Sequence, residues 1–208
     1  MPYTAELIKT TDQITSNWSG GTTTQIAIYP KNSLYNERNF MWRLSSARVE
    51  VEESTFTSLP GIWRLIMVLE GELKLEHSGH HTVQLKPFEQ DSFSGNWSTT
   101  SFGKVRDFNL MLAPGCSGEL AAISIDETDV SKLVVLNPDG ESFSQITSAC
   151  YCVAGKLTIT INAADTYELS PGDLLLLSAG KDMRGLPLTI INTGNSQAQM
   201  VTATIKLD

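Results

Sequence analysis

The stretch that decides the fold is Gly71–Leu75 (GELKL), because the chain repeats its pattern as GKLTI at Gly155–Ile159. The two copies lie 84 positions apart (71 to 155), and the same shift superimposes later residues without a gap. These are Leu85 and Pro87 on Leu169 and Pro171, and Phe93 and Ser94 on Leu177 and Ser178. In each copy a strand reaches a glycine, which allows a bulge or a close approach of two backbones, and a returning strand ends at a proline, which has no N–H for the ladder. We interpret the two stretches as one structural unit used twice.

Strand signals dominate the rest of the chain. Met41–Glu52 and Lys104–Leu112 alternate in side-chain character, and turn signals such as Pro60-Gly61 and Ser78-Gly79 recur at short intervals. Helix is expected only as a turn or two, near Asp126–Lys132. Many short strands separated by frequent turns predict an all-β sandwich or barrel.

The repeated unit resembles the cupin barrel, and the second copy is the closer match. This resemblance implies an all-β bicupin, that is, two tandem cupin-like β-barrels or jelly rolls. We expect residues 1–113 to form the first cupin repeat, which is the ligand-binding candidate, and residues 118–208 to form a second, structural repeat. Another sandwich with proline-stopped hairpins is the alternative.

Composition excludes several classes of protein. The 208 residues carry a net charge of −8, whereas a nucleic-acid binder needs a cationic face. The longest apolar run, around Leu174–Leu177, is too short to cross a bilayer, and the first residues show no signal peptide. Cys116, Cys150 and Cys152 are odd in number and fit no zinc spacing, so we expect reduced, packed thiols. These features predict a cytoplasmic protein without nucleic-acid or membrane partners.

The metal site of cupin enzymes is not expected in this chain. Such enzymes bind a divalent metal through His-x-His, a Glu and a further His. Here Arg64 stands at the position of the Glu, and Ser58–Pro60 stands where the His-x-His would lie. Because a cation at a ligand position repels a metal, we expect a metal-free barrel without a cofactor.

All three histidines lie together in the stretch His77-Ser78-Gly79-His80-His81. Histidine-rich tracts can bind metals. The position at a hairpin turn nevertheless favours a solvated, purely structural cluster, and no metal ligand is assigned.

Arg64 is the leading candidate for ligand binding. It alternates with Ile62, Ile66 and Val68 on one strand face, and a guanidinium facing the interior must meet a carboxylate. That carboxylate is Glu70, Asp107 or a ligand group, which arginine binds through two parallel hydrogen bonds. The alternative is an outer face with a surface partner.

Other polar residues are assigned to the same site. Arg43 poses the same choice as Arg64, and the small Ser45 beside it leaves room for a ligand. Asp107 and Asn109 share a strand face, where they either fix a loop or line the cavity. Trp18 and Thr23 flank the Gly20-Gly21 turn, where a β-turn with Trp18 as a lid is favoured over an anion-binding nest. No nucleophile–base pair is visible, so no catalytic residue is predicted.

Several of these segments together resemble the HutD/Ves family. The resemblance covers about residues 5–112 most strongly and rests on the following segments: Asn17–Thr23, Phe40–Ala47, Phe56, Pro60-Gly61, Arg64, Leu69–Gly71, Phe93–Gly95 and Asp107–Met111. It implies a bicupin without metal. HutD-like members accompany histidine-degradation genes and are thought to restrain that pathway by binding an intermediate. By position, Arg64 would hold the carboxylate of a urocanate- or formylglutamate-like ligand.

Three functional hypotheses follow. The first is a non-catalytic module that binds a small anionic metabolite and regulates histidine utilisation. The second is a metal-independent isomerase or lyase in which Glu70 or Asp107 acts as general base, disfavoured because a nearby arginine lowers the pKa of a carboxylate. The third is a scaffold that forms a homodimer through its sheets, and a Ves-like role in stress responses is a further alternative.

Overall fold

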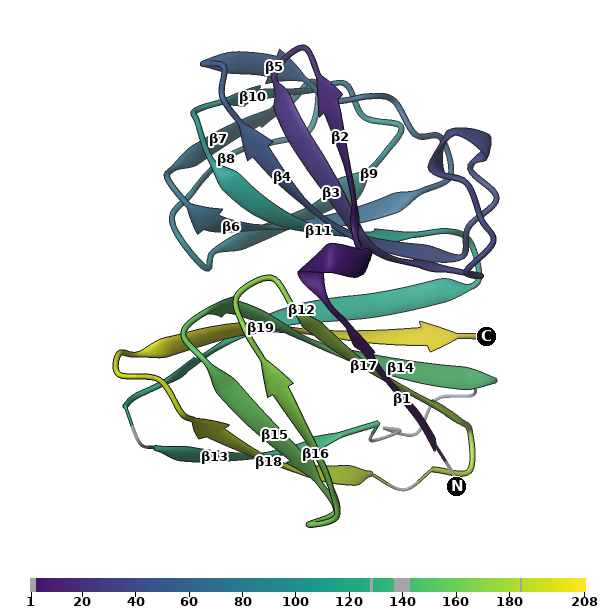
Figure 1. The fold of residues 1–208 in the computed structure, drawn as a ribbon. Coiled ribbons are helices and arrows are strands. Elements are labelled where there is room, and N and C mark those ends of the chain that lie inside the picture. Colours follow the sequence, from purple (N-terminus) through teal and green to yellow (C-terminus); the bar gives the residue numbers. More distant parts are fainter. Residues whose placement is uncertain (1–2, 128, 137–142, 184) are drawn as a thin grey trace. The chain divides into compact units, whose positions relative to one another are not determined.

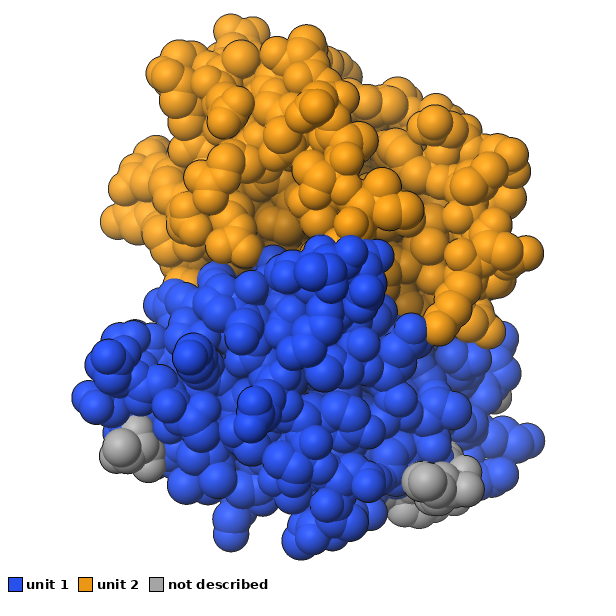
Figure 2. Space-filling model, in the orientation of Figure 1, with its two compact units in different colours: residues 1–12, 116–208 blue, residues 13–115 orange. Residues whose placement is uncertain are grey.

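The computed structural model describes residues 3–127, 129–136, 143–183 and 185–208, which form two compact units (Figures 1 and 2). The first unit comprises residues 13–115. The second unit comprises the described parts of residues 1–12 and 116–208. No helix within the described ranges is long and apolar enough to cross a membrane.

The first unit is built from two antiparallel sheets. The six-stranded sheet has the order β2-β3-β4-β11-β6-β9, and the four-stranded sheet has the order β5-β10-β7-β8. The strands are β2 (Ile14–Trp18), β3 (Gly21–Tyr29), β4 (Trp42–Val49), β5 (Glu53–Thr55), β6 (Trp63–Glu70), β7 (Leu73–His77), β8 (Thr82–Leu85), β9 (Gln90–Ser94), β10 (Thr99–Phe102) and β11 (Arg106–Leu112).

The second unit also has two antiparallel sheets, with the orders β1-β17-β14-β19-β12 and β13-β18-β15-β16. The strands are β1 (Tyr3–Ile8), β12 (Cys116–Ile125), β13 (Val130–Val135), β14 (Gln145–Ala154), β15 (Leu157–Ile161), β16 (Asp165–Leu169), β17 (Leu174–Gly180), β18 (Leu186–Asn192) and β19 (Ala198–Leu207). The core order β12-β19-β14-β17 repeats β4-β11-β6-β9, and the smaller sheets also match strand for strand.

The repeat seen in the sequence is therefore confirmed, down to a shared irregularity. In the β6–β11 ladder Leu69 has no partner, and in the β14–β19 ladder Val153, 84 positions later, has none. Gly71 and Gly155 follow these bulges with φ angles of 86° and 83°. A Cβ on Gly71 would lie 2.5 Å from the Lys104 carbonyl oxygen, so both the turn and the close approach require glycine.

The N-terminal segment differs from the expected boundary, which placed it in the first repeat. β1 pairs with β17, from Tyr3–Ala179 to Ile8–Leu174 (Figure 1). The two strands are neighbours in the sheet although most of the sequence lies between them. Lys9 Nζ donates to Asp173 Oδ2 at 2.9 Å and fixes the end of the segment. The second unit is thus completed by both ends of the chain.

Of the helical turn expected near Asp126–Lys132, the described residues show only one turn hydrogen bond, from the N–H of Asp129 to the carbonyl of Asp126, and Val130–Val135 forms strand β13. Short 3-10 helices occur instead at Thr10–Asp12 and Tyr35–Glu37. The latter places the partly buried ring of Tyr35 against Arg43, as described below.

The interiors of the two units differ in polarity. The second unit has an apolar core that includes Cys150 and Cys152, both unpaired thiols whose pKa burial raises to about 12. In the first unit an apolar cluster with Ile66, Val68 and Phe93 fills only part of the space between the sheets. Charged side chains occupy the neighbouring part.

Candidate functional site

Three central strands of the first unit carry the candidate site. Arg43 on β4, Met111 on β11 and Arg64 on β6 lie directly opposite one another in the ladder. Partners in register point to the same face of a sheet, and Arg64 alternates with Ile66 and Val68, which belong to the core. Both guanidinium groups therefore face the interior, as one of the two sequence interpretations required.

Arg64 is buried, and no hydrogen bond or ion pair joins its guanidinium to a described carboxylate, although Asp107 lies near enough to raise its pKa. Only 7% of the residue is exposed, and none of the described residues accepts a hydrogen bond from its guanidinium. The Nε atom is fully enclosed and unpaired. The guanidinium instead lies 4.6 Å from the ring centre of Phe56 and 5.2 Å from that of Phe93. Burial lowers the pKa of Arg64 to about 10, which leaves the group charged at neutral pH.

Arg43, in contrast, is held by the protein. Its Nε donates to Gln25 Oε1 at 2.9 Å, and its Nη1 donates to Ser45 Oγ at 3.0 Å. The guanidinium lies 4.4 Å from the ring centre of Tyr35. Burial lowers the pKa of Arg43 as well. These neutral partners orient the cation without cancelling its charge.

Asp107 and Asn109 lie on β11 on the same interior face. Asp107 Oδ1 accepts hydrogen bonds from the backbone N–H of Ala47 (3.1 Å) and from Asn109 Nδ2. Burial raises the pKa of Asp107 to about 7, although the bond from Ala47 and the charge of Arg64 oppose this shift. Asn109 Oδ1 is buried and accepts no hydrogen bond from any described residue. The site thus offers an unpaired donor on Arg64 and an unpaired acceptor on Asn109.

The remaining candidates lie elsewhere. Glu70 is exposed and pairs with Arg48 and Arg106 at 3.4 and 3.2 Å, because the bulge at Leu69 reverses the alternation of β6 and turns Glu70 outward. Trp18 is partly exposed at the end of β2, with its ring against Gly20. Thr23 on β3 is half-buried in the ladder row of Ala47 and Asp107, and no side-chain contact links it to either arginine.

The structure adds residues that the sequence analysis missed. Gln25, Tyr35, Phe56 and Phe93 surround the two guanidinium groups. Alternation along β3 and β9 could have placed Gln25 and Phe93 on the inner face. Tyr35 and Phe56 come from connecting segments, where no periodicity indicates a direction.

The same position in the second unit has a different character. Ser148, 84 positions after Arg64, is buried and its Oγ accepts a hydrogen bond from the Leu136 backbone N–H at 3.3 Å. The buried polar residues described in the second unit are Thr147, Ser148, Asp173 and Asn192, and none of them is a cation. The buried arginines described in the structure lie in the first unit.

Arg64 also decides which ligand the interior of the first unit suits. At the point where cupin enzymes place a metal-binding carboxylate, this chain has a buried, unpaired cation. A guanidinium repels a metal ion and attracts an anion. The residues present do not fit the usual cupin metal.

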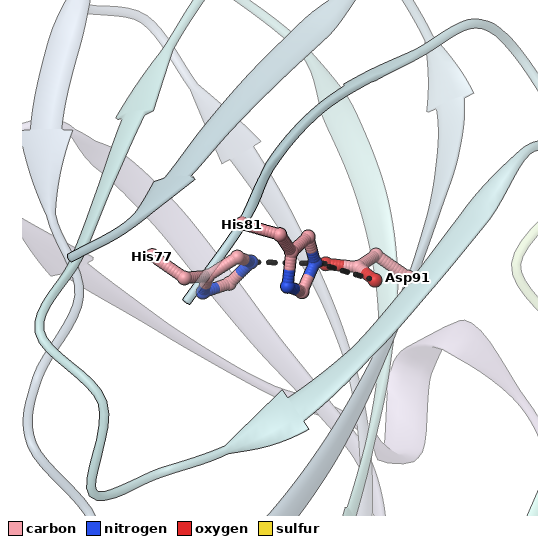
Figure 3. A group of neighbouring side chains, drawn as sticks. All are labelled: His77, His81 and Asp91. Carbon is pink, nitrogen blue, oxygen red and sulfur yellow. Dashed lines mark hydrogen bonds and ion pairs between the residues drawn. The ribbon is translucent and has the colours of Figure 1, made fainter. Parts of the chain in front are cut away.

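The sequence predicted a solvated histidine cluster, but in the structure one of the three histidines is buried. His80 and His81 are exposed, but His77 is 3% exposed, and its Nδ1 and Nε2 make hydrogen bonds to Thr99 Oγ1 (2.8 Å) and Asp91 Oδ2 (2.9 Å). His81 Nε2 lies 3.1 Å from the same carboxylate oxygen (Figure 3). Burial lowers the pKa of His77, with Asp91 opposing the shift. Asp91, from strand β9, is a partner that the sequence did not reveal.

Comparison with known proteins places the chain in a family. The family model HutD matches residues 10–196. No curated protein sequence matches the chain significantly. Among solved structures, the conserved protein of unknown function PA5104 from Pseudomonas aeruginosa PAO1 is similar at 22% identity, with a TM-score of 0.76 and coverage of 97% of this chain and 98% of that one.

Two further structures extend the comparison. HutD from Pseudomonas fluorescens SBW25 shares 22% identity with a TM-score of 0.65, covering 96% of this chain and 98% of that chain. YhhW from Escherichia coli, a bacterial pirin, shares 14% identity with a TM-score of 0.64, covering 99% and 98%. These likenesses confirm the cupin-like jelly-roll fold. Since the family model spans most of its length, the chain belongs to the HutD family, whose members are associated with histidine utilisation.

Proposed function

We propose that the first unit binds a small metabolite carboxylate at Arg64 and that the protein regulates histidine utilisation without catalysing a reaction. The single observation that carries this proposal is the buried guanidinium of Arg64, which has no carboxylate partner among the described residues. Leaving a charge unpaired in an interior costs several kcal/mol. A ligand carboxylate would offset that cost through two parallel hydrogen bonds.

The surroundings of Arg64 indicate more about the ligand. Asn109 and Arg64 are diagonal neighbours on the inner face, because Asn109 pairs with Ile66 and Met111 pairs with Arg64. The unpaired Oδ1 of Asn109 favours a ligand that also carries an N–H group. Urocanate, through its imidazole, and formylglutamate, through its amide, combine a carboxylate with such a donor. Histidine has these groups too, but its ammonium would face two arginines.

Isothermal titration calorimetry with urocanate, formylglutamate and histidine tests the proposal. We expect a Kd of about 1 μM, roughly −8 kcal/mol, for the better of the first two ligands. Arg64→Met should weaken binding by roughly 10- to 1,000-fold, since charge-assisted hydrogen bonds are lost. Arg48→Met, which changes an exposed arginine, is the matched control and should bind normally. Equal affinity of wild type and Arg64→Met would reject the site, and no binding of any of the three would reject the proposed ligand class.

Asp107 favours a second candidate function, a metal-independent isomerase or lyase. Burial raises the pKa of this carboxyl to about 7; Arg64 lowers it, as expected, but burial outweighs the charge of Arg64, so the net shift is opposite to the expected one. A group that titrates near neutral pH can act as general acid or base. NMR of the same ligands incubated with the protein would show turnover, and Asp107→Asn should then abolish turnover while binding persists.

A further inference from the structure

A second group of ligating side chains lies at the end of the β7–β8 hairpin, apart from the arginines. His77, His81 and Asp91 place one ligating atom each within 4.8 Å of one another (Figure 3). The figure shows both imidazole rings directed at the carboxylate of Asp91. The chain brings them together from β7, from the turn before β8, and from β9 of the other sheet. The convergence of two imidazoles and one carboxylate is therefore a product of the fold.

Two of the three distances between ligating atoms match the edges of a metal coordination sphere, and all three atoms lie within 4.8 Å of one another. A first-row divalent ion binds imidazole nitrogen and carboxylate oxygen at about 2.0–2.2 Å, so adjacent ligands lie about 3 Å apart. His77 Nε2 and His81 Nε2 lie 2.9 and 3.1 Å from Asp91 Oδ2. Binding would require an ion to replace the protons that now lie between these atoms.

A supporting residue already orients the buried ligand. His77 Nδ1 is hydrogen-bonded to Oγ1 of Thr99, whose side chain is completely buried. Metal-binding histidines usually make such a bond through their second nitrogen, which fixes the ring and directs the other nitrogen to the metal. His77 also packs against Phe93 with ring centres 4.5 Å apart, so its orientation is constrained on two sides.

The opposite side of the group is open. A depression of about 670 Å³ is lined by the hairpin residues, including His77, His80 and His81. His80 lies outside the triad, because its ring stacks on Trp97 at 3.8 Å. An ion held by three protein atoms would keep open positions facing this depression, as catalytic and exchangeable metal sites do.

We propose that His77, His81 and Asp91 bind a divalent transition-metal ion of the Zn²⁺ type. Two imidazoles and a carboxylate suit zinc, iron, cobalt and nickel better than the oxygen-seeking ions calcium and magnesium. This site is distinct from the barrel interior at Arg64, although Phe93 contacts both His77 and Arg64. It does not depend on the proposed carboxylate ligand.

Titration with ZnCl₂, followed by calorimetry, and with CoCl₂, followed by visible absorption, tests the site. Wild type should bind one equivalent of Zn²⁺ in the micromolar range and give Co²⁺ ligand-field bands. Asp91→Asn and His81→Ala should each weaken Zn²⁺ binding at least 30-fold and remove the bands. His80→Ala is the matched control, since it removes a neighbouring histidine outside the triad, and should stay within threefold of wild type.

Each outcome bears on the proposal. Absence of Zn²⁺ binding by folded wild type would overturn it, as would an equal loss on His80→Ala and His81→Ala, which would indicate a loose surface tract. Should Asp91→Asn misfold, as judged by circular dichroism, the exposed His81 still decides the result. Arg64→Met should leave Zn²⁺ affinity unchanged, which separates this site from the proposed carboxylate site.

Discussion

Replacing Arg64 by methionine should stabilise the first unit. A fall in pKa from the ordinary 12.5 to about 10 means that folding disfavours the charged guanidinium by roughly 3 kcal/mol. Because the folded-state pKa lies below that of the unfolded chain, this penalty is complete at neutral pH, begins to fall as the pH rises above about 10, and is lost as the pH approaches the ordinary 12.5. Methionine keeps much of the packing against Phe56 and Phe93 but carries no charge. We therefore expect a gain of about 1–3 kcal/mol, in the range seen when buried charges are replaced by apolar groups.

Urea denaturation at pH 7 measures this gain. All four tryptophans lie between residues 18 and 97, so fluorescence excited selectively at tryptophan reports on the first unit. With a urea slope of roughly 1–3 kcal/mol per molar, the midpoint should rise by about 1 M. Arg48→Met should change the free energy of unfolding by less than about 0.5 kcal/mol, because Arg48 forms an exposed ion pair with Glu70. A midpoint lowered by Arg64→Met would refute the reasoning and show that the protein itself uses this cation for stability.

Three further changes test other parts of the structure. Asp107→Asn should flatten the pH dependence of stability between about pH 4 and 7; the raised pKa of about 7 means that wild type loses stability as the pH rises through this range, and urea midpoints at pH 5 and 8 would show it. Gly71→Ala should lower the free energy of unfolding by more than about 2 kcal/mol in the same assay, because the new Cβ would meet the Lys104 carbonyl. Gly79→Ala, at φ 76° with open space around it, should lower it by only about 1 kcal/mol. Equal losses would contradict the close approach at Gly71. Asp173→Ala should destabilise the second unit by about 1–3 kcal/mol at pH 7, measured by circular dichroism. Burial opposes ionisation of Asp173, but hydrogen bonds from the N-terminal segment and from the β16–β17 turn lower its pKa. The stability advantage of wild type should therefore fade as the pH falls below about 4, and a difference that persists at pH 2 would argue against this origin.

Local pattern was enough to predict the repeat, and it reduced the orientation of Arg64 to two alternatives, of which the structure shows the inward one. The glycine, the two-residue alternation and the proline that stops the returning strand each reflect short-range backbone geometry. The common bulge at Leu69 and Val153 shows how closely the two copies follow that geometry. The strand face that Arg64 shares with Ile66 and Val68 then follows from simple alternation, because β6 is regular up to the bulge.

The errors share a physical cause, which is that contacts between distant segments leave no local signal. Glu70 was assigned to the interior because alternation was extended through a bulge that the sequence does not mark. Asp91 meets His77 across two sheets, and neither strand shows a pattern that predicts the meeting. The pKa of Asp107 was misjudged in sign because the sequence shows its charged neighbours but not the extent of its burial.

The position of β1 has a consequence for biosynthesis. Residues 13–115 form a unit of their own, but the partner of β1, strand β17, is made some 170 residues after β1. Until then Ala5 and Leu7, which pack against the core of the folded second unit, remain exposed apolar residues that can associate with other chains. Expression of residues 116–208 alone would create the complementary hazard, an open edge at β17 ready to pair with another copy. Supplying Tyr3–Ile8 as a separate peptide should suppress that aggregation, and the two pieces should then complement each other.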